Sequence, residues 1–415
     1  MAGNVSTARV PGFAQGLFLL LPITLAVIGV SVFTATVNQM QEHFSYLPNG
    51  AYLVNLLQTM PGFWIVAFSP VAGWLADRFG RRRIVILSML VYAVAGVAPF
   101  RLEDIYAILA TRCVVGMCES VILTVTTTML CDYFKGHARH RWLASQTGVA
   151  SLSALVIIPL GGALGAKFGW KGPFLVYLYS LVLVVFVIAW CWEPAHEAPS
   201  ADEVAEVNAD AVYQSIPWAR MSGIIAITLV GSMMFYSTIT QNANALVELH
   251  VTSPAEIGKY ATLASFGVPV GTLLFWVLGR LHIGLLLFIN FLLVGAGFVW
   301  MSHATTPGTY VLAANLQQTG CGLMLPTLLV WATRGLAYQV RGRGNGLWQG
   351  AFGLGLFISG AAIQYMGSLY GNSILAAFGV LGKVSLVAAA LALLAKFIWG
   401  RKALPTGHDH EDSVP

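Results

Sequence analysis

Twelve long apolar runs constrain the fold of this 415-residue chain more than any other feature. Each run is about 18 residues or longer, enough for a helix to cross a bilayer. Only a helix satisfies its own backbone within one spanning segment, so the runs predict twelve transmembrane helices and an all-α integral membrane protein. The runs lie near 14–38, 50–74, 84–101, 105–130, 143–166, 172–192, 219–243, 257–279, 283–302, 309–332, 345–367 and 373–398.

The composition excludes a water-soluble fold of this size. Apolar residues make up 57% of the chain and charged residues only 9%, against roughly a quarter charged in soluble domains. The net charge of +5 comes mostly from arginines in short loops, with no basic face that would suit nucleic acid. We expect the protein to be a monomer that lies in a lipid bilayer and does not bind nucleic acid. The cysteine and histidine spacings predict no disulfide framework, metal or cofactor.

Lysine and arginine placement predicts the orientation. With the N-terminus in the cytoplasm, sixteen of these residues fall on the inner side of the membrane. Four fall on the outer side: Arg101, Lys167, Lys171 and Lys259. Basic residues favour the cytoplasmic side of a membrane. We therefore expect both termini to be cytoplasmic, in a cell membrane and most simply the inner membrane of a bacterium.

One long polar segment divides the chain. Glu193 to Trp218 is acidic, with no internal lysine or arginine, and it lies between the sixth and seventh runs. It predicts an N-terminal six-helix bundle at 1–192, a cytoplasmic linker at 193–218, a C-terminal six-helix bundle at 219–400 and a cytoplasmic tail at 401–415. Two six-helix halves suit a repeat architecture with a binding site between them near the middle of the bilayer.

The loop between the second and third runs carries the most specific motif. Gly73 to Arg83 reads G-W-L-A-D-R-F-G-R-R-R. This run resembles the loop signature G-x-L-x-D-R-x-G-R-R of the major facilitator superfamily. The resemblance implies two pseudo-symmetric six-helix bundles and a cytoplasmic gate, whose matching residues are Asp77, Arg78, Arg81 and Asp132. Asp77 can also face the positive N-terminus of the eleventh helix. The alternative is that the motif is only a turn and an orientation signal.

Two charged residues lie within the fourth run. Arg112 and Glu119 are seven residues apart, so they share one helix face about 10 Å apart along the axis. A charge inside a membrane normally faces the protein interior or a water-filled cavity. A motion that changes the distance between them would load and release a proton on Glu119. Arg112 and Gly116 also resemble the R-x-x-x-G of the family's fourth-helix signature, which implies proton transfer. The alternative is an internal charge pair that locks the bundle.

Lys383 is a third charge, near the middle of the last run. It is a candidate for a second titrating group or an anion contact. The resemblance implies a peripheral twelfth helix, which favours instead a side chain that extends to the membrane surface or makes a local packing contact.

A set of amide, hydroxyl and aromatic side chains is expected to line the central cavity. The polar candidates of the first half are Thr34, Asn38 and Gln146. Those of the second half are Gln241, Asn242, Asn244, Asn315, Gln318 and Gln349, with the aromatic residues Tyr236, Trp348 and Phe352. Each alone is also suited to a contact between helices. Together they predict a pocket for a lipophilic or amphipathic small molecule.

The fifth run bears on the direction of transport. Ile158-Pro159-Leu160-Gly161-Gly162 resembles the glycine-proline signature of the drug:proton antiporter group, although Ile158 stands where that signature has glycine. The resemblance implies a proton-coupled, alternating-access exporter of small lipophilic or amphipathic molecules, and not an enzyme. The alternatives are a proton-coupled importer of an organic acid or other metabolite, with Arg112 or Lys383 at the anion, and a membrane sensor that does not transport.

Overall fold

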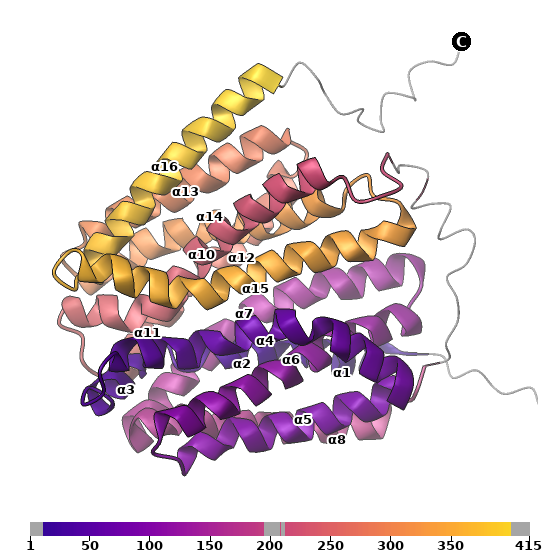
Figure 1. The fold of residues 1–415 in the computed structure, drawn as a ribbon, viewed down its shortest axis with the longest axis horizontal. Helices are drawn as coiled ribbons and strands as arrows, with labels where there is room; N and C mark the ends of the chain where they lie inside the picture. Colours follow the sequence, from indigo (N-terminus) through magenta and orange to yellow (C-terminus); the bar gives the residue numbers. More distant parts are fainter. Residues whose placement is uncertain (1–10, 195–207, 209–211, 400–415) are drawn as a thin grey trace, which may run out of the picture.

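The structure is a computed structural model that describes residues 11–194, 208 and 212–399. Long α-helices run in roughly the same direction, with the first half of the chain on one side and the second half on the other (Figure 1). Within the described residues, the one β contact is an isolated bridge between Tyr213 and Leu336. Most of the predicted linker and all of the tail at 401–415 lie outside the described residues, so the domain boundaries remain a prediction.

The first half begins with a broken span. Pro22 lacks the N–H that would continue the first helix, so α1 ends before it. A turn in which the Thr34 N–H donates to the Ser31 carbonyl at 3.3 Å makes the second break. The elements of this half are α1 (Phe13–Leu20), α2 (Ile23–Ser31), α3 (Val37–His43), α4 (Gly50–Phe79), α5 (Arg81–Val97), η1 (Ala98–Phe100), α6 (Ile105–Tyr133), α7 (Gly136–Phe168), η2 (Gly169–Leu178) and α8 (Tyr179–Trp190).

The second half has one interrupted span, between α11 and α12 at Phe266. Just after this break, Gly267 packs against the helix that contains Asn315. A Cβ on Gly267 would lie only 2.2 Å from the Asn315 carbonyl oxygen. The helices of this half are α10 (Trp218–Glu248), α11 (Pro254–Ser265), α12 (Gly267–Leu278), α13 (Ile283–Ser302), α14 (Pro307–Thr333), α15 (Tyr338–Ser368) and α16 (Ile374–Trp399).

The helices account for the predicted membrane spans. Ten segments of the described residues are long and apolar enough to cross a bilayer. One of these, Arg141–Trp190, holds two successive spans, α7 and the pair η2 and α8. α14 adds a further span of 27 residues, packed against α12 and α13. The all-α membrane fold with twelve spans is thereby confirmed for the described part of the chain.

The turns between helices gather at two ends of the molecule. The linker side holds the turns at 80, 134–135, 279–282 and 334–337, together with the described residues 191–194 and 212–217. The far side holds those at 44–49, 98–104, 249–253, 303–306 and 369–373. Across the two halves, α4 packs against α15 and α7 packs against α11.

Glycines bring the halves into backbone contact near the far side. A Cβ on Gly162 of α7 would lie 2.7 Å from the Pro254 carbonyl oxygen and against Gly258, both on α11. A Cβ on the neighbouring Gly161 would lie 2.1 Å from the Val32 carbonyl oxygen. Small residues allow transmembrane helices to approach this closely. Gly162 therefore closes the far side of the interface between the halves, while Gly161 packs against the first span within its own half.

Candidate functional site

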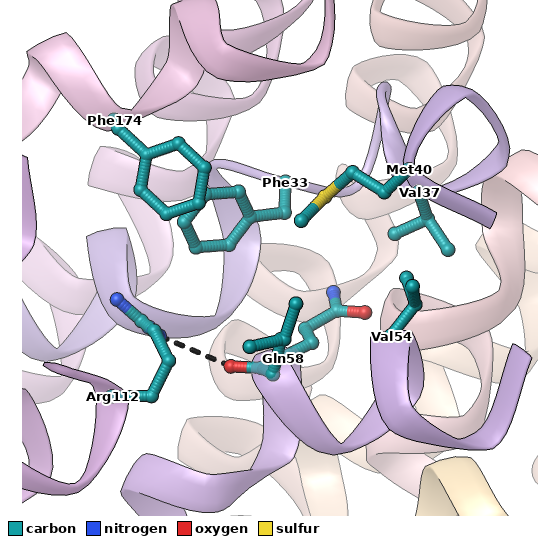
Figure 2. A pocket seen from close by; sticks show the side chains of 8 residues that line it. Phe33, Val37, Met40, Val54, Gln58, Arg112 and Phe174 are labelled. Carbon is teal, nitrogen blue, oxygen red and sulfur yellow. Dashed lines mark hydrogen bonds between the residues drawn. The ribbon is translucent and has the colours of Figure 1, made fainter. Parts of the chain in front are cut away.

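Arg112 of α6 is fully buried, and its guanidinium is held by three different elements. Nε donates to the Leu57 carbonyl at 3.0 Å, the bond marked in Figure 2, and Nη2 donates to the Gly29 carbonyl at 2.8 Å. Nη1 donates to the Tyr177 hydroxyl at 2.5 Å. The ring of Phe33 lies 5.0 Å from the guanidinium carbon, within range of a cation–π contact. Arg112 thus ties α2, α4 and η2 to α6.

The sequence explains why these carbonyls are free. Pro61 lies inside α4, four residues after Leu57, and its nitrogen has no hydrogen to donate. The Leu57 carbonyl therefore lacks its usual helical partner. Gly29 lies in the last turn of α2, where carbonyls also have no helical partner. Breaks in the first and second spans create the acceptors that a buried arginine needs.

Glu119 lies on the same side of α6, two turns further along, and it is 1% exposed. Both carboxylate oxygens are buried and have no hydrogen-bond partner. One of them, Oε1, would lie 2.2 Å from a Cβ on Gly29. The absence of a side chain at Gly29 therefore makes room for this carboxylate.

Arg112 and Glu119 do not form an ion pair with each other, although both are described. The guanidinium bonds the carbonyl of Gly29, while the carboxylate packs against its α-carbon side. The alternative of a direct charge pair that locks the bundle is therefore wrong for this conformation. Gly29, against which Glu119 packs, belongs to α2, and α2 contacts α10 of the opposite half. Glu119 accordingly sits close to the interface between the halves.

Four hydrogen bonds from neutral side chains join the halves between this centre and the far side. Thr34 Oγ1 donates to the Ile239 carbonyl at 3.3 Å, and Asn38 Nδ2 donates to the Ala243 carbonyl at 3.4 Å. The other two run through one amide: Asn55 accepts from Gln241 Nε2 at 3.1 Å and donates to Gln364 Oε1 at 3.2 Å. Asn244 Nδ2 donates to Gln241 Oε1 at 2.6 Å and holds that amide in place.

Three of the predicted cavity residues, Thr34, Asn38 and Gln241, thus contribute to the contact between the halves. Asn55 and Gln364 were missed. The signal that could have found them is an amide within a long apolar run, the same signal that identified Asn38.

The aromatic candidates do come together. Tyr236 on α10 lies 5.3 Å from Phe352 on α15, measured between ring centroids, and Phe352 stacks on Trp348 at 5.6 Å. Phe235 completes this group, which we call the aromatic cluster (Phe235, Tyr236, Trp348 and Phe352). The Trp348 indole N–H is buried without a hydrogen-bond acceptor. The cluster therefore offers apolar ring surface and one unused donor.

Other predicted cavity residues pack within one half. Gln146 donates to Thr127 at 3.0 Å, Asn242 accepts from Tyr310 at 2.6 Å, and Asn315 donates to the Leu263 carbonyl at 2.9 Å. Gln318 is buried with an unpartnered Oε1, while Gln349 is exposed.

Lys383 is exposed on α16, the peripheral last helix. It was a candidate for an anion contact inside the protein, and its exposure makes that interpretation wrong. The favoured reading, a side chain that reaches outward from a peripheral helix, agrees with this position.

The predicted gate residues form a charged cluster on the linker side. Arg81 pairs with Asp132 of α6, and it lies 4.0 Å from Asp77. Glu193 accepts from the backbone N–H groups of Arg81 and Arg82 at 2.6 and 2.9 Å, and so caps the start of α5. In the sequence Glu193 is one acid of an acidic linker, and its capping role follows from its place at the N-terminus of α5, where a negative charge is favourable.

This cluster belongs entirely to the first half. The Arg78 guanidinium lies over the ring of Trp74 at 5.3 Å, and the Asp77 side chain is 67% exposed. The described hydrogen bonds that join the halves, from Thr34, Asn38, Gln241 and Asn55, all lie toward the far side. The halves are therefore joined by neutral hydrogen bonds at the far side, whereas the charged cluster on the linker side lies in the first half.

A model of the Major Facilitator Superfamily matches residues 19–339. The chain belongs to the major facilitator superfamily. Its family comprises membrane transporters, not enzymes, and the helices described above make it a multi-pass membrane protein. A solved D-xylose–proton symporter superposes with a TM-score of 0.74 at 13% identity, over 92% of this chain and 97% of that one. At that identity the likeness supports the fold of this transporter alone.

Two curated relatives match shorter stretches of this transporter. The niacin transporter NiaP of Acinetobacter baylyi is 30% identical over 128 residues, which are 31% of this chain and 29% of that protein. The bacillibactin exporter of Bacillus subtilis is 29% identical over 155 residues, which are 35% of this chain and 37% of that protein. The chain therefore matches about a third of the length of these relatives.

Proposed function

We propose that this transporter couples the movement of its substrate to protons, with Glu119 as the proton carrier. The observation that carries the proposal is a carboxylate buried against Gly29 with no hydrogen-bond partner on either oxygen. A buried charge left without a partner destabilises a conformation by several kcal/mol. The free energy of that conformation therefore depends on whether Glu119 carries a proton, and protonation is linked to the movement of the halves.

Arg112 is proposed to hold the helices around α6 together while the halves move. Its three bonds hold the broken first span, the second span and η2 around α6. Because Arg112 and Glu119 touch the same glycine from two sides, a shift of α2 along α6 changes the surroundings of both. This arrangement gives a physical route from helix movement to proton binding.

The substrate class follows from the aromatic cluster. Its four rings carry no charge, and the polar group with an unused hydrogen-bonding atom within the cluster is the Trp348 N–H. Apolar rings with a few placed polar groups favour a lipophilic or amphipathic small molecule. The substrate would sit between α10 and α15, beside the interface at which Glu119 lies.

We further propose that the linker side faces the cytoplasm of a bacterial cell, as the sixteen-to-four distribution of lysine and arginine indicates. We assign the conformation described above as the one open to the cytoplasm, because the described hydrogen bonds between the halves lie toward the far side. In the opposite conformation, the far side opens and Asp77 of the charged cluster meets the N-terminus of α15. The transporter works in this scheme as a monomer of two six-helix halves.

Export is the proposed direction. An importer of an organic acid needs a free cation for the anion, and the two candidates were Arg112 and Lys383. Lys383 is exposed, and the three nitrogens of Arg112 already donate to protein acceptors. The glycine pair of the fifth span, which resembles the exporter signature, lies at the closed far side. Import of a small metabolite remains the second candidate.

The test is a screen in inverted membrane vesicles that carry the transporter, with a pH-sensitive dye inside. An energised, acidified vesicle should lose protons when an exported substrate is added outside. Neutral and cationic lipophilic compounds should give this signal, and organic acids should not. Proton movement with organic acids alone would support the importer, and no proton movement with any transported compound would remove the coupling proposal.

A further inference from the structure

A large cleft among the described residues lies apart from the aromatic cluster and has no role in the proposal above. It has a volume of about 840 Å³. Its floor is a stripe of α15 that includes Arg343, Leu347 and Leu354, and its walls come from Trp218 and Ile225 of α10 and Val66 of α4. Trp218 is the first residue of α10, so the cleft opens at the linker side. We call it the linker-side groove.

The groove faces away from the aromatic cluster and toward the bilayer. Arg343, Leu347, Gly350 and Leu354 recur at helical spacing and form one face of α15. At 100° per residue, Trp348 and Phe352 point to roughly the opposite face. The groove face continues along α15 as the exposed apolar side chains Leu354, Ile358 and Tyr365. Such a stripe on a transmembrane helix contacts lipid chains, so the groove is open to lipid.

The charge of the groove is positive at one end only. Arg343, whose side chain is exposed, is the one charged residue among the described lining residues. The N-termini of α10 and α15 lie at the same end, and helix N-termini favour anions. Trp218 is 64% exposed there, and tryptophan is enriched where the headgroups of a bilayer meet water. The groove thus combines an apolar trough with an anion-binding rim.

We propose that the linker-side groove binds an anionic phospholipid from the leaflet on the linker side. Its phosphate lies at Arg343 beside Trp218, and an acyl chain lies along Leu347 and Leu354. Val66 is the one lining residue from the first half, so closing the linker side brings α4 toward α15 and narrows the groove. A ligand that fits one conformation better shifts the population toward it. The lipid therefore favours the conformation that is open on the linker side.

Lipid binding tests the proposal on the purified full-length transporter by native mass spectrometry. Phosphatidylglycerol and phosphatidylcholine of equal chain length are added in separate titrations. We expect tighter binding of phosphatidylglycerol, by about fivefold for one arginine at a membrane surface. Arg343→Gln should remove that preference. Arg280→Gln, an exposed arginine on the same side but outside the groove, should leave it intact. Equal binding of both lipids by the unaltered protein, or a preference retained in Arg343→Gln, would overturn the proposal.

A second variant tests the trough without touching the charge. A Cβ on Gly346 has no atom within 4 Å, so the side chain of Gly346→Phe starts in open space and is expected to occupy the groove that Gly346 lines. It should weaken binding of both lipids. Gly342→Phe, on the same helix with equal free space, lies outside the lining and should bind as the unaltered protein does. Full lipid binding by Gly346→Phe, or a changed substrate KM in this variant with lipid binding unchanged, would assign the groove to something other than lipid.

Discussion

The two ends of the molecule are built from different chemistry. At the far side the halves meet through glycine backbone and neutral amides, with Gly162 against Pro254 and Asn55 between Gln241 and Gln364. At the linker side, ion pairs and a capping carboxylate lie within the first half, and Asp77 is exposed. The neutral contacts at the far side depend on close packing, so they break when the halves rotate. The charged cluster at the linker side is already assembled and is proposed to meet the N-terminus of α15 when that side closes. The comparison predicts that the two sides respond differently to mutation.

Gly162→Leu should have the largest effect. The new side chain meets the backbone of Pro254, which has no flexible end to move. Overpacking costs about 1–3 kcal/mol, which shifts a two-state equilibrium by about 5- to 150-fold. Transport should be nearly lost, and a cysteine in the central cavity should become accessible from the far side. Gly148→Leu is the matched control on α7, where a Cβ meets nothing within 4 Å. Normal transport by Gly162→Leu would contradict the claim that close glycine packing closes the far side.

Asp77→Asn should abolish most transport while the protein still inserts and folds. Arg81 keeps its pairing with Asp132, so the fold of the cluster survives. What is lost is the charge that meets the N-terminus of α15 when the linker side closes. Transport assays in vesicles, with purification yield as the measure of folding, separate the two effects. Full transport by Asp77→Asn would leave the motif as a turn and an orientation signal.

Asn55→Ala should have a smaller effect and sharpen the far-side account. It leaves the amides of Gln241 and Gln364 without this partner, which costs about 1–3 kcal/mol for a buried group. The population should move toward the conformation open at the far side, as measured by cysteine accessibility, with little dependence on salt because no charge is involved. Asn315→Ala removes a side-chain hydrogen bond within one half and should leave the equilibrium between the two conformations unchanged. Equal shifts in both variants would contradict a role specific to the interface.

The smallest effect concerns an ion cluster on the far side that does not join the halves. The hydrogen bond from Lys171 holds the pKa of Glu103 below its usual range, and His43 lies 3.4 Å away. Because the folded pKa is lowered, the contact stabilises the fold above the usual carboxyl pKa and is lost as pH falls through the lowered value. Glu103 is exposed, so Glu103→Gln should change the Tm only slightly at pH 7 and not at all in strong acid. A large loss of transport in this variant would show that charge also operates the far side.

Sequence predicted the fold well because its signals are local. Long apolar runs, the loop motif and the basic-residue bias each lie within one segment. Partners could not be predicted in the same way, because they depend on how helices rotate against each other. Thr34 and Asn38 were found as polar residues, but nothing in the chain indicated that they bond the backbone of α10. Arg112 bonds carbonyls that are freed by Pro61 and by the break after Ser31. This pairing could not be predicted, because the sequence does not show which helices surround Arg112.

The central claim is that Glu119 carries the coupled proton. The most direct test compares two assays of one variant: substrate exchange at equal pH, and substrate accumulation driven by a pH gradient. Glu119→Gln should exchange substrate across the vesicle membrane at equal pH, because the aromatic cluster is intact. It should fail to concentrate substrate when a pH gradient is imposed. Glu256→Gln, an exposed acid at the start of α11, should do both. If Glu119→Gln folds and still accumulates substrate against its gradient, the proton is carried elsewhere and the account is wrong.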